Sequence, residues 1–443
     1  MNLDVNLPPG PRGSLLPSMQ MIQKPIESFR KWGAQYGHTF TVKRLGVPTV
    51  VTAEPDLIGE IYSVRDIELY DQVVVPTADT LFGAHSLLLI SGARHQRERK
   101  LMTPPFHGDR IRGWAQTMAD AGRRAFAEGG EMRFGEQTKQ ATLEVIVRVV
   151  FGVGETARVE EFMHAIEAWT RMIRPGFLFY RALQHDYLGL APYARYRRAS
   201  DHINALLVDQ IGRVRKGEGE RSDVLSGLVD ARYDDGSLME DEIVRDHLRT
   251  LLFGGHETTA TILTWVMYFV HRHPEVRERL LAELDTLGPD PDLEAMTRLP
   301  YLGAVIDETL RMRPVTTEIS RQLRKPWKLG PWSLPSGSAV CPAVTLLHFR
   351  PDLWPDPERF SPERFLDKKP EPNTFIPWGG GTHRCLGAVF ARFEAGVIIG
   401  TLLREFEFEL LDEQVEWGRG RVALEALGGV RVRVRPKTRA TTR

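Results

Sequence analysis

Hydrophobic and polar positions follow a helical period along most of the chain, and the shorter period of strands in a few places. Apolar residues that recur every three or four positions predict helices over 26–36, 53–62, 112–150 and 159–211, with loops inside the two longest ranges. Residues 39–45 and 48–52 are rich in β-forming residues and flank Gly46, so they predict a hairpin. The region 71–90 is apolar but irregular.

The second half of the chain continues the helical pattern and then turns to short strands. Ser237 and Glu240 have the spacing of a capping box, which predicts a helix from this point to His273, before Pro274. Further helices are predicted over 275–287, over 301–312 and from Cys385 to Arg404, and short strands within 327–344, 406–410 and 430–434. The pattern therefore predicts a mainly α fold with a small β portion.

Composition narrows the class of protein. A length of 443 residues is enough for about three domains of roughly 150 residues, but no linker divides the chain, so one domain over residues 1–443 is expected. Lys and Arg together number 58, as do Asp and Glu. The resulting formal net charge of zero does not favour nucleic acid or an anionic membrane surface as a partner.

The number of cysteines and the composition of the N-terminus indicate the cellular compartment of the protein. The chain has two cysteines, Cys341 and Cys385, which is too few for a disulfide framework and suits a reducing cytoplasm. Residues 1–13 are polar and rich in proline, without an apolar stretch of signal-peptide or anchor length. A cytoplasmic protein without a membrane anchor is therefore expected.

The stretch 375–387 reads Phe-Ile-Pro-Trp-Gly-Gly-Gly-Thr-His-Arg-Cys-Leu-Gly and holds one of the two cysteines. Three consecutive glycines predict a tight loop rather than a helix or strand. Cys385 follows His383 and Arg384 directly before a helical pattern, a setting that favours the thiolate. A buried structural thiol is the ordinary alternative, and a phosphate loop is excluded because no Lys-Ser or Lys-Thr follows the glycines. The combination favours a thiolate ligand of haem iron.

Polar residues also interrupt the predicted helix that ends at His273. Gly254 and Gly255 lie at its centre, where each costs about 1 kcal/mol relative to alanine. Glu257 and Thr258 follow, and a threonine hydroxyl can bond back to a carbonyl one turn earlier. No second histidine follows His256 at the spacing of a zinc site. These residues by themselves fit either of two structures. One is a kinked core helix, and the other is a helix whose backbone is in close contact with another group.

Two further pairs of polar residues have helical spacing. His95 and Arg99 share a helix face, which suits two donors reaching one anionic group as well as an ordinary solvated face. Glu308 and Arg311 can form an ion pair. Apolar residues surround this second pair in the sequence, so it could be buried, where an ion pair needs further partners.

The segment Trp378 to Gly387 resembles the cysteine-ligand loop of the cytochrome P450 superfamily. Trp378 stands where that family usually has phenylalanine. Three further motifs occur in the order found in the family, and the resemblance covers nearly the whole chain. It implies the cytochrome P450 fold enclosing one haem b, with Cys385 as the iron ligand.

The resemblance also assigns roles to other residues. Glu257 would feed protons, and Thr258 would hold the oxygen ligand and its water. The haem propionates would be bound by His95, Arg99, Arg321 and His383. Glu308, Arg311 and Arg364 would form a structural triad that holds the cysteine loop, with Arg359 as the second candidate for the third position.

A greasy substrate pocket is implied as well. The residues expected to line it are Phe82, Leu88, Phe177, Phe179, Leu252, Gly255, Val315 and Ile319, and residues 172–180 resemble the mobile lid of the family. Glu318 could bond the substrate or point away. A fatty-acid or terpenoid-like substrate is expected, and a macrocycle stays open.

The function that the resemblance implies is insertion of one atom of O2 into an apolar substrate by a monomeric enzyme. Electrons would come from a separate ferredoxin or flavodoxin and its reductase, because no flavin- or nicotinamide-binding region is visible. A basic docking face is expected from Arg97, Lys100, Arg384 and Arg392. A peroxide-driven or isomerising haem enzyme and a non-catalytic haem sensor are the alternatives, and the Glu257–Thr258 pair argues against them.

Overall fold

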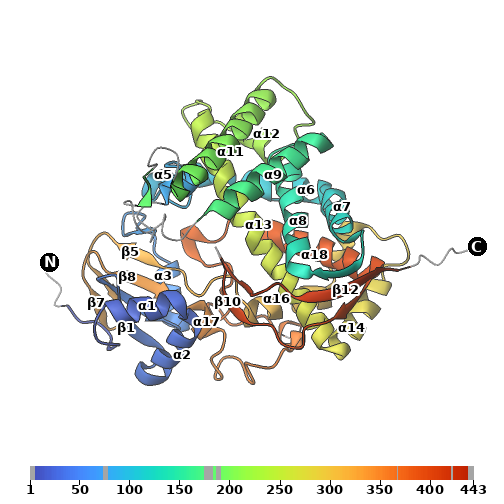
Figure 1. The fold of residues 1–443 in the computed structure, drawn as a ribbon. Helices are drawn as coiled ribbons and strands as arrows, with labels where there is room; N and C mark the ends of the chain where they lie inside the picture. Colours follow the sequence, from blue (N-terminus) through green and yellow to red (C-terminus); the bar gives the residue numbers. More distant parts are fainter. Residues whose placement is uncertain are drawn as a thin grey trace, which may run out of the picture.

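The computed structural model describes residues 5–72, 78–173, 183–185, 191–366, 368–420 and 423–437. Figure 1 shows a large helical part beside a smaller part in which strands and the N-terminal helices lie together. The α-helices are α1 (Leu15–Gln23), α2 (Pro25–Tyr36), α3 (Pro55–Tyr62), α4 (Asp79–Phe82), α5 (Gly92–Met102), α6 (Asp109–Gly113), α7 (Ala115–Phe126), α8 (Phe134–Val145), α9 (Thr156–Met172), α11 (Pro192–Arg215), α12 (Val224–Asp230), α13 (Asp241–Arg272), α14 (Pro274–Asp285), α15 (Leu293–Met296), α16 (Pro300–Met312), α17 (Val344–Leu347) and α18 (Ala388–Glu405).

The longest described helix, α13, crosses the middle of the helical part (Figure 1). Its 32 residues span about 48 Å at a rise of 1.5 Å per residue. Acidic residues occupy its first turn and basic residues its last, which complements the helix dipole. Apolar side chains from Ile262 to Val270 are buried on all sides, so this half of α13 is a core element.

The predicted end of α13 is confirmed, but the predicted start is wrong. The helix begins at Asp241, and Ser237 caps nothing there. The Ser237 hydroxyl and amide both bond to Asp235 Oδ1, at 2.6 and 2.9 Å. A local turn therefore engages the Ser237 amide, which would donate to Glu240 in a capping box, and the Ser237 hydroxyl, which would accept there.

Helices α8, α16 and α18 pack against α13 and fix its rotation. Thr138 Oγ1 of α8 lies 3.0 Å from Thr264 Oγ1, and Thr142 Oγ1 donates to the His256 carbonyl oxygen at 3.1 Å. The end of α8 continues into a π-helical turn, Ile146–Val150, whose apolar residues are buried. Cross-helix bonds at two levels set which residues of α13 face away from α8.

Within the described ranges, the β portion comprises four small sheets. Strands β1 (Thr39–Arg44), β2 (Val47–Thr52), β8 (Ala339–Pro342), β5 (Arg321–Leu323) and β3 (Tyr70–Gln72) form one sheet in that order, in which only β2 and β8 are parallel. A second sheet has the order β4 (Gly130–Arg133), β12 (Arg431–Pro436) and β9 (Phe406–Leu410), and two hairpins are β6 (Trp327–Leu329) with β7 (Trp332–Leu334), and β10 (Trp417–Arg419) with β11 (Leu424–Ala426).

Most predicted elements are confirmed, including the 39–52 hairpin with its partners Phe40 and Val51. The helical prediction over 112–150 is wrong for residues 130–133, which form β4. Gly129 and Gly130 have positive φ, so the chain leaves the helical conformation there, and the following residues pair with β12 near the C-terminus. That pairing depends on a segment some 300 residues away, which a local pattern does not contain.

Among the helices of the described ranges, none combines the length and apolarity needed to cross a bilayer.

Candidate active site

The cysteine loop is held by short backbone bonds. The Cys385 amide donates to the Trp378 carbonyl oxygen at 2.8 Å, and the Gly379 amide donates to the Ile376 carbonyl oxygen at 3.1 Å. Gly387 then precedes α18 as its N-cap residue. The loop thus turns back on itself and presents the thiol of Cys385 at an accessible surface directly before a buried helix.

The three glycines are required by close neighbours rather than by the turn alone. Gly379 and Gly381 have φ of 66° and 64°, which side chains seldom adopt. A Cβ on Gly380 would lie 2.2 Å from the ring of Tyr62, and one on Gly381 would lie 2.7 Å from the Tyr62 carbonyl oxygen. The backbone of the loop therefore packs directly on the end of α3.

Four basic side chains gather beside the loop. The ring centroids of His95 and His383 are 4.0 Å apart, and Arg99 Nη2 donates to the Arg384 carbonyl oxygen at 2.7 Å. Arg321 is buried, and its guanidinium donates to the Ser320 carbonyl oxygen at 3.0 Å. Within the described ranges no carboxylate pairs with Arg99 or Arg321. Buried positive charge without a negative partner is costly, so the cluster suits an anionic ligand.

Electrostatics of the two histidines agree with this interpretation. Burial lowers the pKa of His95 to about 4, and the charges of Arg99 and Arg321 contribute. Burial lowers the pKa of His383 to about 3, with contributions from Arg321, His95 and Arg99. Both imidazoles are neutral at neutral pH and can each offer one N–H donor. The charge of the cluster therefore resides on the two arginines.

The expectation that the surroundings of Cys385 favour the thiolate is not supported for the free thiol. Burial raises the pKa of Cys385, and the Gly387 amide and the charges of Arg99 and Arg384 only partly oppose this effect. Coordination to a metal removes a thiol proton outright. The chemistry of the donor set thus fits a metal-bound thiolate better than a free nucleophile.

One face of α13 is exposed at Gly254. Gly254 is exposed although it lies at the centre of a buried helix, and a Cβ built on it meets nothing within 4 Å. Thr258 lies one turn later on the same face, and its hydroxyl donates to the Gly254 carbonyl oxygen. The helix continues without interruption through both residues. The helix does not need a kink to expose this face, because Gly254 has no side chain that would cover it.

Gly255 and its neighbour Gly254 differ in their surroundings, and only Gly254 is exposed. A Cβ on Gly255 would lie 2.7 Å from Ile146 Cδ1, so this glycine allows α13 to approach the π-helical turn. Leu252 is buried and lines a small cavity with Trp169 of α9. Two residues correspond to about 200° around a helix, which puts Leu252 on the face opposite Gly254.

The other predicted pocket residues differ in their surroundings. Phe82 packs edge-on against Phe253 with centroids 4.8 Å apart, and Leu88 is 39% exposed. Ile319 lies against Gly379 of the cysteine loop. The Val315 carbonyl oxygen accepts the Leu424 amide at 2.9 Å. Phe177 and Phe179, with most of the predicted lid, lie outside the described residues.

The predicted Glu308–Arg311 ion pair is present and fully buried, with 0% exposure of both side chains. Arg311 Nε and Nη2 donate to the two Glu308 carboxylate oxygens at 2.7 and 2.9 Å. Arg364 Nε lies 3.4 Å from Glu308 Oε1. Arg359 instead offers its carbonyl oxygen to Arg311, so the third basic side chain at Glu308 is Arg364.

A connection from this ion pair to the cysteine loop runs through His348, which sequence reasoning missed. Arg311 Nη1 donates to the His348 carbonyl oxygen at 2.8 Å. His348 Nε2 accepts the Ile376 amide at 3.0 Å. Burial and the charge of Arg311 lower the pKa of His348 to about 3, which keeps the ring neutral and able to accept. A lone histidine after a short strand gave no sequence signal for this role.

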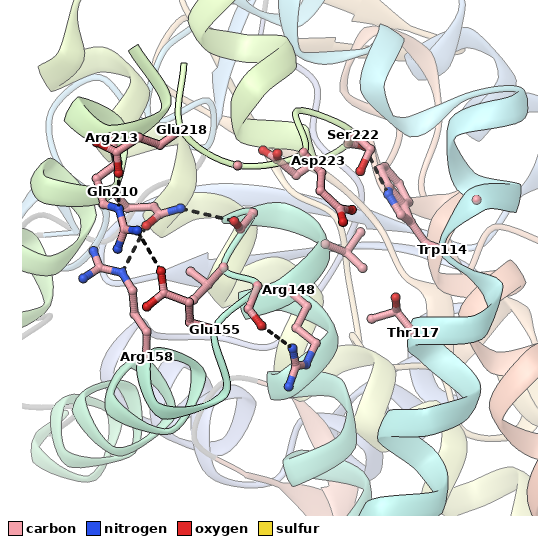
Figure 2. Close-up of a pocket in the computed structure, with 17 residues that line it drawn as sticks. Trp114, Thr117, Arg148, Glu155, Arg158, Gln210, Arg213, Glu218, Ser222 and Asp223 are labelled. Atoms are coloured by element: carbon pink, nitrogen blue, oxygen red, sulfur yellow. Dashed lines mark hydrogen bonds and ion pairs between the residues drawn. The ribbon is translucent and has the colours of Figure 1, made fainter. Parts of the chain in front are cut away.

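A separate polar cavity of about 610 Å³ lies among α7, α9 and α11. Figure 2 shows Arg213 between Glu155 and Glu218, with Arg158 beside Gln210. It shares no residue with the cysteine loop, the basic cluster or α13. Its arginines Arg148, Arg158 and Arg213 already pair with carboxylates, so it is a poor candidate for the active site.

Comparison with known proteins decides the family. The family model for cytochrome P450 matches residues 7–419. The chain belongs to the cytochrome P450 family.

Individual cytochromes P450 match over almost their whole length. Cytochrome P450 138 of Mycobacterium tuberculosis is 32% identical over 441 residues, 97% of each chain. Cytochrome P450 135B1 of the same organism is 32% identical over 447 residues, covering 97% of this chain and 92% of its own. A retinoic acid-bound cyanobacterial CYP120A1 has a TM-score of 0.84 at 23% identity, covering 98% of this chain and 100% of its own. That structure confirms the predicted cytochrome P450 fold.

Membership of the cytochrome P450 family carries a general activity. The protein is a haem-thiolate monooxygenase that uses O2 on an apolar substrate. The residues present fit haem, because an accessible thiol, two arginines without a carboxylate partner among the described residues and an exposed helix face meet the needs of iron, propionates and ligand.

Proposed function

We propose that the protein is a cytoplasmic haem b monooxygenase, one domain over residues 1–443 and monomeric, which oxidises a fatty-acid or terpenoid-like substrate. The observation that carries the proposal is the buried Arg321, which has no carboxylate partner in the described chain, next to the accessible thiol of Cys385. Haem, when bound, supplies activation of dioxygen and its insertion into a C–H or C=C bond.

The residues around the cysteine loop would hold the cofactor. Cys385 would bind the iron, since its thiol is the accessible one of the two cysteines. His95, Arg99, Arg321 and His383 would bind the propionates, which supply the negative charge that the basic cluster lacks. Glu308, Arg311 and Arg364 would hold the loop in place through His348 and Ile376.

Residues of α13 would transfer protons. Glu257 lines a narrow gap between α13 and α9, where it could exchange protons with solvent. Thr258 Oγ1 lies on the open face, and its bond to the Gly254 carbonyl oxygen orients its lone pairs. A proton held on Glu257 could therefore reach the open face through the Thr258 hydroxyl and a water.

Replacing Thr258 with alanine should separate electron use from product formation. Loss of a positioned proton donor costs about 10²-fold or more in the step it serves, so product should fall by about that factor while electron consumption continues. The measurement is product and hydrogen peroxide formed per electron pair. Thr258→Ser should restore coupling.

The neighbouring threonine supplies a matched control for this experiment. Thr259 is buried with no hydrogen-bond partner for its hydroxyl among the described residues. Thr259→Ala should leave coupling unchanged. Equal coupling in Thr258→Ala and the wild type would contradict the proton role and favour the sensor or peroxide-driven alternatives.

Electrons would reach the protein from a separate ferredoxin or flavodoxin and its reductase. Of the four residues of the expected basic docking face, three are engaged: Arg97 lies over the Tyr233 ring, Lys100 pairs with Asp234, and Arg392 pairs with Asp307. Arg384 is exposed and borders a surface cavity of about 470 Å³ beside Trp378. Arg384 is therefore the strongest candidate for partner recognition.

Charge reversal at Arg384 should slow reduction by a ferredoxin in a salt-dependent manner. We expect Arg384→Glu to lower the second-order reduction rate about tenfold at low ionic strength and far less at high salt. Stopped-flow reduction over a salt series measures this effect. Arg433→Glu is the control for an equal change in net charge, because Arg433 lies on β12 and does not belong to the expected docking face. A salt-independent loss would contradict electrostatic docking.

A further inference from the structure

Apolar side chains are exposed together on α1, which lies beside β1 and α2 in the smaller part of the molecule (Figure 1). Leu15 and Leu16 begin α1 and are 73% and 66% exposed, and Met19 lies one turn after Leu15 on the same face. The other face of α1 carries the buried Ser18 and Met21. A surface helix usually exposes polar residues opposite its buried face, so contacts within the described chain leave the two leucines unexplained.

The tip of the β1–β2 hairpin adds another exposed apolar side chain. Leu45 is 62% exposed and has a φ of 49°, a conformation that leucine seldom adopts. Two hydroxyls at α1 bind this tip: Ser18 Oγ accepts the Leu45 amide at 2.8 Å, and Ser14 Oγ accepts the Gly46 amide at 2.9 Å. The apolar patch on α1 and the hairpin tip therefore consists of Leu15, Leu16, Met19 and Leu45.

The same part of the chain is strongly basic. Residues 5–53 contain six Lys and Arg residues and one acidic residue, Glu27, although the whole chain has no net charge. Arg30 pairs with Glu358, and Arg44 pairs with Glu318. The remaining basic residues are exposed and form no ion pair with a residue of the described ranges, and they are Arg12, Lys24, Lys31 and Lys43.

Local contacts put part of this charge at the edge of the apolar patch. The Lys43 carbonyl oxygen accepts the Ser18 hydroxyl at 3.0 Å, so Lys43 lies next to α1 on the hairpin. Arg12 precedes Leu15 by three residues, and Lys24 directly follows the end of α1. Exposed apolar groups flanked by cations are the combination that binds at the surface of a bilayer with anionic lipids.

We propose that α1 and the tip of the β1–β2 hairpin form a docking surface for a bilayer that contains anionic lipids. The apolar patch would enter the headgroup region, and the four basic side chains would contact lipid phosphates. With its nine residues, α1 is about 14 Å long, so it lies on the bilayer and does not cross it.

A second copy of this chain fits the surface less well. In a symmetric dimer the same patch meets itself, which would bring the four unpaired basic residues of each copy together and cost energy by repulsion. The inference goes beyond the proposed function, because it concerns where the enzyme is held and not what it oxidises. An apolar substrate dissolved in that bilayer would then be concentrated near the enzyme.

Vesicle binding by the full-length, haem-loaded protein tests the assignment. One set of vesicles consists of phosphatidylcholine, and the other of phosphatidylcholine and phosphatidylglycerol in equal parts. The wild type should bind the anionic vesicles at least about tenfold more tightly at low salt, and this preference should decrease at high salt because salt screens the charges. Co-sedimentation over a series of lipid concentrations measures the partition coefficient.

Substitutions separate the apolar contribution from the charged one. Leu16→Gln with Leu45→Asn should weaken binding to anionic vesicles about tenfold, because two side chains no longer leave water. Asparagine adopts the left-handed conformation more readily than leucine, so this double variant should be no less stable than the wild type at position 45. Lys43→Glu should also weaken binding about tenfold at low salt and far less at high salt.

Two residues elsewhere supply matched controls. Val208→Gln removes a side chain that is 48% exposed on α11, and Arg433→Glu reverses a charge on β12. Both variants should bind vesicles as the wild type does. Thermal unfolding of every variant shows whether a loss of binding accompanies a loss of stability.

Three outcomes would overturn the assignment. They are equal binding of the wild type to neutral and anionic vesicles, equal losses in Val208→Gln and in the double variant, and a dimer without vesicle binding that the double variant dissociates. The last outcome would assign the patch to a second copy of the chain. Vesicle binding requires no turnover, so its failure would leave the proposed monooxygenase function unaffected.

Discussion

Replacing Cys385 with serine should abolish monooxygenation and remove the long-wavelength Soret band of the reduced carbon-monoxide complex. A thiolate ligand pushes electron density toward O–O cleavage, and a hydroxyl does not. The loss should be at least about 10³-fold in turnover, equivalent to about 4 kcal/mol in activation free energy. The measurement is the carbon-monoxide difference spectrum together with product formation at equal haem content.

The other cysteine of the chain is the matched control. Cys341 lies fully buried in β8 beside Glu318, away from the accessible surface of the loop. Cys341→Ser should keep the long-wavelength band and most of the activity. A variant at Cys385 that retained the band would remove Cys385 as the iron ligand, and purified wild type that binds no haem would contradict the cofactor assignment altogether.

Replacing Arg311 with methionine should destabilise the protein by about 3–5 kcal/mol, because it leaves the Glu308 carboxylate buried without its main partner. The variant also loses the bond from Arg311 to the His348 carbonyl oxygen. We therefore expect haem to dissociate from Arg311→Met at denaturant concentrations at which the wild type retains it. Denaturant unfolding followed by both circular dichroism and haem absorbance measures the two effects.

An exposed pair of the same residue types provides the comparison. Glu167 and Arg171 form an ion pair across one turn of α9, with side chains 34% and 66% exposed, so Arg171→Met should cost about 0.5 kcal/mol or less. The double variant Glu308→Leu with Arg311→Met should recover part of the stability, since both buried charges are gone. If haem retention stays normal in Arg311→Met, the triad does not hold the cysteine loop.

Some site features were predictable because their residues are neighbours in the sequence. The loop around Cys385 carries its glycines within seven residues, and Glu308 and Arg311 are three residues apart on one helix. Helical and extended periods also reflect local backbone geometry, which explains why α2, α16, α18 and the β1–β2 hairpin appeared where expected. The sequence by itself therefore determined the family, the mainly α fold and the identity of the candidate iron ligand.

The tertiary structure decided which residues contact one another around the site. One residue step rotates a helix by about 100°, so packing against Ile146 made Gly254 and not Gly255 the open position. Glu318 met Arg44 across 274 residues, which settled the direction of its side chain. His348 joined the buried ion pair to the cysteine loop only after folding. Such contacts depend on distances in space, and separation along the chain does not encode them.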